Sequence, residues 1–197
     1  MDKLSKSTQT ESTVAASIST NTANATKIYA FEIKLNHGHK VPIWRTIEVP
    51  ATYSFYDLHV AIQDSMGWSD SHLHKFNMIN PANNRGVHIG IPDDWMSKSI
   101  KPEKHTPIAN YFSPSNAICA YEYDFASPWN FHVTLKTILE KDANARYPRC
   151  VAGNCASPPE ECPADPSDMS WVKQPFDYSK ITFRDPVEAW EDAFQGF

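Results

Sequence analysis

Apolar residues occupy every second position from Tyr29 to Leu35. This period of two is typical of a strand with one buried face. The polar segment 36–38 predicts a turn, and a second strand follows from Val41 to Val49, with Pro42 near its start, where a missing N–H is tolerated. The two runs together predict a β-hairpin.

The clearest helix signal begins at Ser54. Ser54 is a favoured N-cap, and Asp57 stands where a short variant of the capping box needs a carboxylate. Four apolar residues then share one face at helical spacing, namely Phe55, Leu58, Ile62 and Met66. Gly67 supplies the left-handed stop, so we expect this helix to end there and to lie on the sheet.

Beyond this helix the pattern predicts a middle strand from about His72 to Ile79. A long, proline-containing loop from Asn80 to Asn116 follows, with a short helix at Ile108–Phe112. Two strongly patterned strands, Ala117–Phe125 and Asn130–Leu139, then predict a second hairpin.

The chain closes with a further loop to about Trp171 and a helix start at Asp185, where Pro186 suits the first helical position. This order of elements predicts an α+β fold. We expect a mixed, mainly antiparallel sheet of about five strands, made of two hairpins and the middle strand, with one main helix packed on it and a C-terminal helix.

Composition divides the chain into a tail and one domain. Residues 1–26 are rich in Ser, Thr, Asn and Ala without apolar periodicity, which predicts a flexible tail. Residues 27–197 then form a single domain, with a core at 27–162 and a C-terminal extension at 163–197. The whole chain has 197 residues with 41% hydrophobic content, enough for one core.

Hydrophobic runs, net charge and cysteine content limit where the protein is expected to act and what it is expected to bind. No apolar run approaches the roughly 18 residues of a membrane span, and the N-terminal stretch lacks the apolar segment of a secretory signal, so we expect a cytoplasmic protein with no membrane partner. The net charge of -5 argues against nucleic-acid binding through phosphate neutralisation. In a reducing compartment the four cysteines are expected to be thiols.

Arg45 is the most unusual residue of the predicted sheet, because it shares a strand face with Ile43, Ile47 and Val49. Three interpretations are open. Arg45 extends to the sheet edge and keeps its charge in water, it forms an ion pair with Asp57 or Asp124, or it binds an anionic ligand directly.

Histidines form a second group of candidates. His72 and His74 are expected on one face of the middle strand and His59 on the neighbouring helix, and Asp124 or His132 would complete a metal site. The competing interpretation is a set of hydrogen-bonded structural histidines, which we favour. No cofactor is therefore predicted, with zinc or iron as the alternative.

Three cysteines lie in the loop after the second hairpin: Cys150, Cys155 and Cys162. Structural zinc sites usually contain a closely spaced cysteine pair, and no C-x-x-C occurs among these three. A cysteine-lined turn held by prolines is the favoured interpretation, with zinc binding left open.

Several ordered motifs resemble the plasmid pRiA4b ORF-3-like family, whose members are known as passenger proteins of insertion-sequence elements. The resemblance covers about residues 27–162, and the ending Ile181–Pro186 is also similar. The motifs are Pro42-Ile43-Trp44-Arg45, Asp57-Leu58-His59, Gly67-Trp68, His72-Leu73-His74, Tyr123-Asp124-Phe125, Trp129 with His132, Tyr147-Pro148 with Cys150, and Pro158-Pro159-Glu160.

The resemblance implies a compact α+β fold, a link to plasmids and mobile elements in prokaryotes, and no established reaction. Two departures concern possible chemistry. Ala126-Ser127 stands where the family has Gly-Asp, and Ser157 stands where a cysteine often precedes the two prolines. A family acid at position 127 would thus be missing, which lowers the expectation of catalysis.

The favoured hypothesis is a non-catalytic protein-interaction or accessory module with an unknown protein partner. Three tryptophans would form its aromatic surface, namely Trp44, Trp68 and Trp129. The candidate binding or structural polar cluster is Arg45, Asp57, His59, His72, His74, Asp124, His132 and Glu160. The alternatives are a metal-dependent hydrolase that uses His72, His74 and Asp124, and a DNA-associated accessory of transposition.

Overall fold

The computed structural model describes residues 24–36, 41–92, 100–161 and 174–194. The predicted tail therefore lies outside the described residues except for 24–26, and Cys162 lies outside them as well. Among the described residues, no helix combines the length and the apolar character that crossing a membrane requires.

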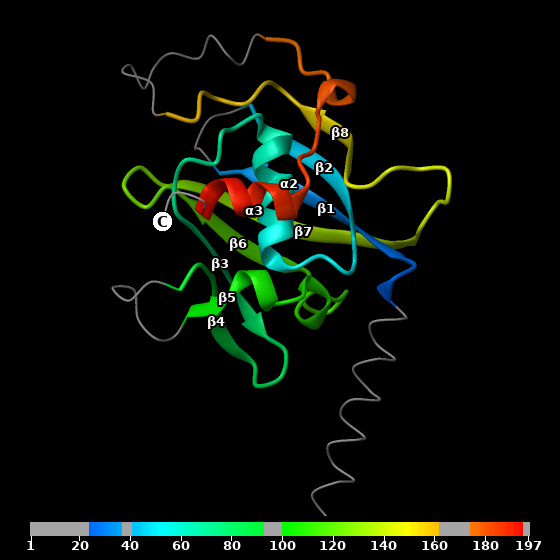
Figure 1. The fold of residues 1–197 in the computed structure, drawn as a ribbon, viewed down its shortest axis with the longest axis vertical. Coiled ribbons are helices and arrows are strands. Elements are labelled where there is room, and N and C mark those ends of the chain that lie inside the picture. The colour runs from blue at the N-terminus through cyan, green and yellow to red at the C-terminus, as the bar shows by residue number, and fades with distance from the viewer. Residues whose placement is uncertain (1–23, 37–40, 93–99, 162–173, 195–197) are drawn as a thin grey trace, which may run out of the picture.

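Eight strands form one sheet in the order β5-β4-β3-β6-β7-β1-β2-β8 (Figure 1). Neighbouring strands are antiparallel except β4 and β5, which are parallel. The strands are β1 (Lys27–Leu35), β2 (Ile43–Pro50), β3 (His74–Asn80), β4 (Arg85–Gly90), β5 (Ile100–Pro102), β6 (Ile118–Tyr123), β7 (Trp129–Glu140) and β8 (Arg149–Asn154). The predicted α+β class and mixed, mainly antiparallel sheet are confirmed.

The predicted number of about five strands is wrong, because β4, β5 and β8 lie in segments that the pattern assigned to loops. Strand β4 carries two glycines and mostly exposed positions, so it shows little apolar alternation. Strand β5 has three residues, and the six residues of β8 are all half-buried. These strands form because a neighbouring strand offers backbone hydrogen bonds, which a local pattern does not record.

Both predicted hairpins are present. Strand β1 pairs with β2, and β6 pairs with β7. The two hairpins join through β1 and β7, with Ile33 opposite Val133. The predicted middle strand, β3, begins at His74 rather than His72 and pairs with β6.

Helix α2 (Phe55–Met66) has the predicted caps. The Ser54 hydroxyl accepts a hydrogen bond from the Asp57 backbone N–H at 3.2 Å, and the Asp57 carboxylate accepts one from the Ser54 N–H at 2.8 Å. Gly67 ends the helix with φ at 71°. This reciprocal capping fixes where the helix starts.

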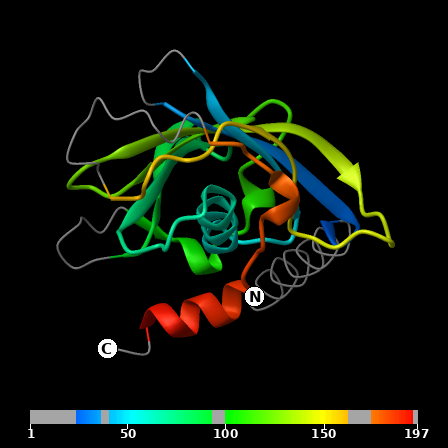
Figure 2. The ribbon, with the colours of Figure 1, turned by 90° about the horizontal axis from the view of Figure 1, so that it is seen from above.

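The sheet arches over α2, and helix α3 (Pro186–Phe194) lies on the other side of α2 (Figures 1 and 2). Asp185 caps α3 as predicted, since its carboxylate accepts from the Val187 N–H at 2.8 Å. Tyr56 and Val60 of α2 pack on Ala189. Helix α2 is thus covered on two sides, so polar side chains that it carries toward the sheet are enclosed.

Three short 3-10 helices complete the described elements: η1 (Glu103–His105), η2 (Ile108–Asn110) and η4 (Tyr178–Lys180). The short helix predicted at 108–112 is the 3-10 turn η2. The main apolar core fills the space between α2 and the concave face of the sheet, where Phe55, Phe76 and Phe131 are completely or almost completely buried.

Candidate functional site

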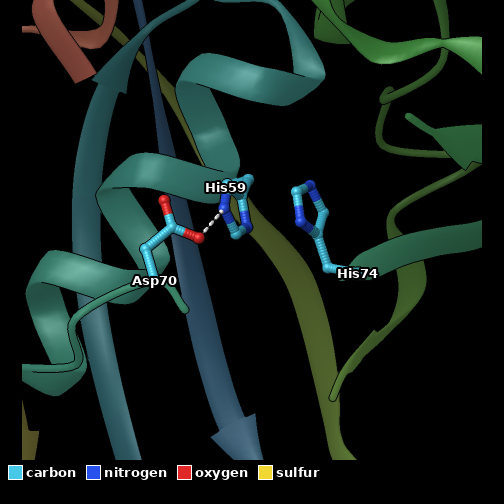
Figure 3. Close-up of side chains that lie close together, drawn as sticks. All are labelled: His59, Asp70 and His74. Carbon is cyan, nitrogen blue, oxygen red and sulfur yellow. Dashed lines mark hydrogen bonds and ion pairs between the residues drawn. The ribbon is translucent and has the colours of Figure 1, made fainter. Parts of the chain in front are cut away.

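Two histidines and a carboxylate meet beneath α2 (Figure 3). His59 comes from α2 and is 1% exposed, and His74 is the first residue of β3 and is 4% exposed. Their imidazole rings are parallel, with centroids 3.3 Å apart and an interplanar angle of 5°. Asp70 places a carboxylate oxygen 2.7 Å from Nε2 of His59.

The turn after α2 brings these residues together. Gly67 stops the helix, and Asp70 adopts φ of 64°, a left-handed conformation that aspartate tolerates better than most residues. The chain then enters β3, where His74 lies opposite Tyr123 of β6. Because one end of this segment is fixed by a helix stop and the other by a strand pair, the Asp70 carboxylate faces the histidines.

A second layer of polar groups surrounds the pair. The Glu103 carboxylate, from η1, lies 2.7 Å from Nε2 of His74 and is itself 1% exposed. The Tyr121 hydroxyl lies 2.8 Å from Nδ1 of His59 and accepts a hydrogen bond from Gln63 Nε2 at 2.8 Å. We call His59, Asp70, His74, Glu103, Tyr121 and Gln63 the histidine cluster.

Two acceptor atoms of the histidine cluster have no hydrogen-bond partner among the residues that the structure describes. They are Oε1 of Glu103 and Oε1 of Gln63, both completely buried. A buried carboxylate or amide oxygen normally accepts a hydrogen bond, because leaving it unpaired costs about 1–3 kcal/mol. The cluster therefore has more acceptors than donors.

The pKa shifts of the histidine cluster also indicate that it lacks positive charge. Burial and the adjacent His74 lower the pKa of His59, so burial works against a positive charge there. Burial acts to raise the pKa of Asp70, but the attraction and hydrogen bond of His59 outweigh it and lower that pKa. Arg184 contributes a cation only at the rim, with Nη2 3.8 Å from Asp70. The cluster is short of positive charge.

The histidine cluster brings three possible metal ligands close together. One ligand atom from each of His59, Asp70 and His74 lies within 4.8 Å of the other two. Tetrahedral ligands at zinc distances stand about 3.3 Å apart, so the widest pair would have to approach by about 1.5 Å. Because the two imidazole rings are parallel and ligate through lone pairs in the ring plane, binding one ion would also require the rings to turn toward each other.

The metal set predicted from the sequence was His72, His74 and Asp124, and the structure does not bring these three together. His72 lies before β3 with Nε2 3.0 Å from Glu161 and Nδ1 4.0 Å from Asp124. His74 instead points into the histidine cluster. The predicted additional ligand His132 is exposed on β7.

Arg45 is 1% exposed, so the interpretation that it reaches water is wrong. The predicted ion pairs are wrong as well, because Asp57 caps α2 and Asp124 accepts from the Ala126 N–H at 3.0 Å. Arg45 instead donates four hydrogen bonds to neutral oxygens: Ser65 O at 3.0 Å, and Trp44 O, Asn154 O and Ser157 Oγ at 2.9 Å each. No carboxylate of the described residues pairs with it.

Glu160 anchors the Pro-Pro-Glu segment. Its carboxylate accepts hydrogen bonds from the N–H and hydroxyl of Ser69, the N–H of Ser71 and the hydroxyl of Tyr123. Burial acts to raise its pKa, but these bonds lower the pKa of Glu160 to about 2. Glu160 is thus a carboxylate with its hydrogen bonds satisfied.

The predicted aromatic surface is not formed as expected. Trp68 is 6% exposed and donates from its indole to the Pro158 carbonyl at 2.9 Å. Trp129 is half-buried and donates to the Glu160 carbonyl at 2.9 Å. Trp44 is half-buried. Two of the three tryptophans hold the Pro-Pro-Glu segment in place instead of facing a partner.

Among the described residues the cysteines are free: Cys119, Cys150 and Cys155. Burial raises the pKa of Cys150, which makes it a less ready thiolate. Because Cys162 lies outside the described residues, the predicted three-cysteine set stays a prediction.

Sequence reasoning included His59 and His74 but missed Asp70, Glu103, Gln63 and Tyr121. Gln63 had a local signal, since it follows His59 by four residues and lies on the same helix face. Asp70 and Glu103 had none, because they lie in a turn and in a short 3-10 helix.

Residues 27–180 match the family model described as "Plasmid pRiA4b ORF-3-like protein". The chain is similar to the uncharacterized protein y4hQ of Sinorhizobium fredii (strain NBRC 101917 / NGR234), with 27% identity over 131 residues, which are 66% of this chain and 64% of that relative. It also resembles the crystal structure of a protein of unknown function, MM3350, from Methanosarcina mazei Go1, with 32% identity, a TM-score of 0.66, and coverage of 83% of this chain and 97% of the other.

Proposed function

The chain belongs to the plasmid pRiA4b ORF-3-like protein family, and we propose that it acts as a non-catalytic module that binds a divalent transition-metal ion through His59, Asp70 and His74. The observation that carries the proposal is that one ligand atom from each of these three residues lies within 4.8 Å of the other two in a buried cluster. Two further buried oxygens of the cluster, on Glu103 and Gln63, have no donor among the described residues, which is consistent with a missing positive charge.

Charge balance favours an ion over protons. The carboxylates of Asp70 and Glu103 lie in one buried cluster and need compensating positive charge. Protonation of both histidines would place two cations in rings 3.3 Å apart, where they repel each other. One divalent cation supplies the same charge and accepts lone pairs directly from the ligands.

The ligand types suit zinc or ferrous iron. Two imidazole nitrogens and one carboxylate oxygen form a set that both ions accept. With an ion on Nε2 of His59, the Nδ1–H would donate to the Tyr121 hydroxyl oxygen, 2.8 Å away. An outer hydrogen bond of this kind fixes the ring orientation of a metal ligand.

The burial of the ligands favours a structural ion over a catalytic one. A hydrolytic metal keeps an open position for water and substrate. His59 and His74 are 1% and 4% exposed, and only Asp70, with 13% of its side chain exposed, approaches the surface. The hydrolase alternative, which used His72, His74 and Asp124, would require His74 to turn out of the histidine cluster toward the other two residues. The protein partner, the DNA-associated alternative and the link to mobile elements stay predictions.

The test is metal analysis of the full chain without an affinity tag. Elemental analysis should find about one zinc or iron per chain, and chelation should lower the melting temperature. An ion at 100 times its dissociation constant stabilises by about 2.7 kcal/mol, which corresponds to about 5–10 °C for a chain of this size. Cobalt added to the chelated protein should give visible absorption bands without thiolate charge transfer.

The matched variants are His74→Gln and His132→Gln, since one changes a buried ligand and the other an exposed histidine. The metal-induced gain should disappear in His74→Gln and persist in His132→Gln. Equal gains in both variants, or no gain in the unmodified chain, would contradict the proposal.

A further inference from the structure

We propose that the cavity beside Arg45 binds a small organic monocarboxylate with an apolar body. The cavity measures about 530 Å³ and opens to solvent between the C-terminal end of α2 and the segment 176–184. Pockets of this size accommodate small-molecule ligands. This inference does not depend on the metal ion, because none of the three proposed ligands lines the cavity.

Arg45 provides the first argument. Its guanidinium has five N–H groups, and four of them donate to the neutral oxygens described above. Among the described residues no acceptor pairs with the fifth N–H, on Nη2, so it is available to a ligand. A buried cation without an anion costs several kcal/mol. Burial lowers the pKa of Arg45 to about 10, which reflects this cost.

The remaining charges of the cavity set the charge of the ligand. Three cationic side chains and two carboxylates line it: Arg45, Lys180, Arg184, Asp64 and Asp177. Arg184 pairs with Asp64 at 2.7 Å, and Lys180 lies 3.7 Å from Asp177. Both carboxylates are therefore compensated, and among the described lining residues Arg45 is the excess charge. One positive charge favours a monoanion over a phosphate dianion.

Apolar side chains provide the second argument. Met66, Trp68, Phe176 and Ile181 line the same cavity. The Phe176 ring covers one face of the guanidinium, with its centroid 3.7 Å from Cζ of Arg45. A ligand must then reach the Nη2 edge in the guanidinium plane while its body contacts these apolar side chains. A carboxylate on an aromatic or short aliphatic group meets both conditions.

Arg45 also has a structural role, because its Nε donates to Ser65 O in the last turn of α2. The decisive variant must therefore leave Arg45 in place. Ala156 lines the cavity and is half-buried, so Ala156→Leu would reduce the available volume without removing the guanidinium. Arg85, exposed on β4, provides the matched control Arg85→Met.

The experiment titrates benzoate, octanoate, benzamide and inorganic phosphate into the full chain, with calorimetry and with ¹H–¹⁵N spectra that follow the Trp68 indole N–H. We expect saturable benzoate or octanoate binding that moves the Trp68 signal, weakens at least tenfold in Ala156→Leu and Arg45→Met, and is unchanged in Arg85→Met. Benzamide should not bind.

Three outcomes would overturn the proposal. The first is no saturable carboxylate binding at millimolar concentration, and the second is equal affinity in Ala156→Leu. The third is phosphate or benzamide binding as tightly as benzoate. If Arg45→Met fails to fold, Ala156→Leu decides the question.

Discussion

The two polar sites along α2 have opposite deficits. The histidine cluster lies beneath the helix middle and has two buried acceptor oxygens without donors. The Arg45 site lies at the helix C-terminal end and has a buried cation without an anion among the described residues. A core can therefore enclose charge of either sign where a fixed neighbour, such as a helix end or a histidine ring, partly compensates it.

Removal of the cation should have the largest effect. Arg45→Met leaves three backbone carbonyls and the Ser157 hydroxyl without their donor, so we expect a loss of about 3 kcal/mol in the free energy of unfolding. Denaturant titration measures it. Arg85→Met should change the value by less than about 0.5 kcal/mol. A loss below about 1 kcal/mol for Arg45→Met would mean that water replaces these bonds.

In the histidine cluster, Glu103→Gln should change the stability of the protein in opposite directions with and without the metal ion. Glu103→Gln removes one buried negative charge, so it should stabilise the metal-free protein by about 1 kcal/mol. The same change should weaken the metal-bound protein, because the ion then loses a nearby anion. Melting curves with and without chelator give both values. A change of the same sign in the metal-free and metal-bound melting temperatures would contradict an excess of negative charge in the histidine cluster.

Glu160 is a reference carboxylate whose hydrogen bonds are satisfied. Its folded pKa of about 2 lies below the ordinary glutamate value of 4.5, so it stabilises the fold above pH 4.5, and this contribution is lost as pH falls from 4.5 toward 2. Allowing for its partial exposure, we expect about 1–2 kcal/mol. Unfolding free energies at several pH values should show a shallower acid loss for Glu160→Gln. Parallel curves would contradict the assignment.

The smallest effect should come from Arg184, which contacts both sites. It lines the Arg45 cavity and lies 3.8 Å from Asp70. Arg184→Met should tighten metal binding, because a cation leaves the site, and weaken carboxylate binding, each by about twofold to fivefold. Titrations of the one protein with zinc and with benzoate test this. Changes in the same direction would show that Arg184 acts through the fold rather than through charge.

Local signals in the sequence predicted the elements that depend on local chemistry. Ser54 and Asp57 satisfy each other within one helical turn, and Asp185 caps α3 in the same way. Strands β4 and β8 were missed because β4 contains two glycines and every residue of β8 is half-buried. Only a neighbouring strand gives them their structure.

The site was predictable only in part. The pattern placed Arg45 on the buried face of its strand, and it is buried, but the residues that satisfy it are backbone oxygens that no sequence pattern displays. His72 and His74 were expected to act together, yet β3 begins only at His74, so the alternation does not extend to His72. Asp70 and Glu103 reach the histidines through turns.

The two edges of the sheet differ in what a second copy of the chain could add to them. Strand β5 has three residues and ends in Pro102, which lacks an N–H, so this edge offers a further strand little to pair with. Among the described strands, β8 is the longer edge, with six residues, so it offers a second copy more backbone groups to pair with than β5 does. If two copies joined through β8, the symmetric pair would present only its short β5 edges, among the described strands, to a further copy, which disfavours growth into a continuous ribbon.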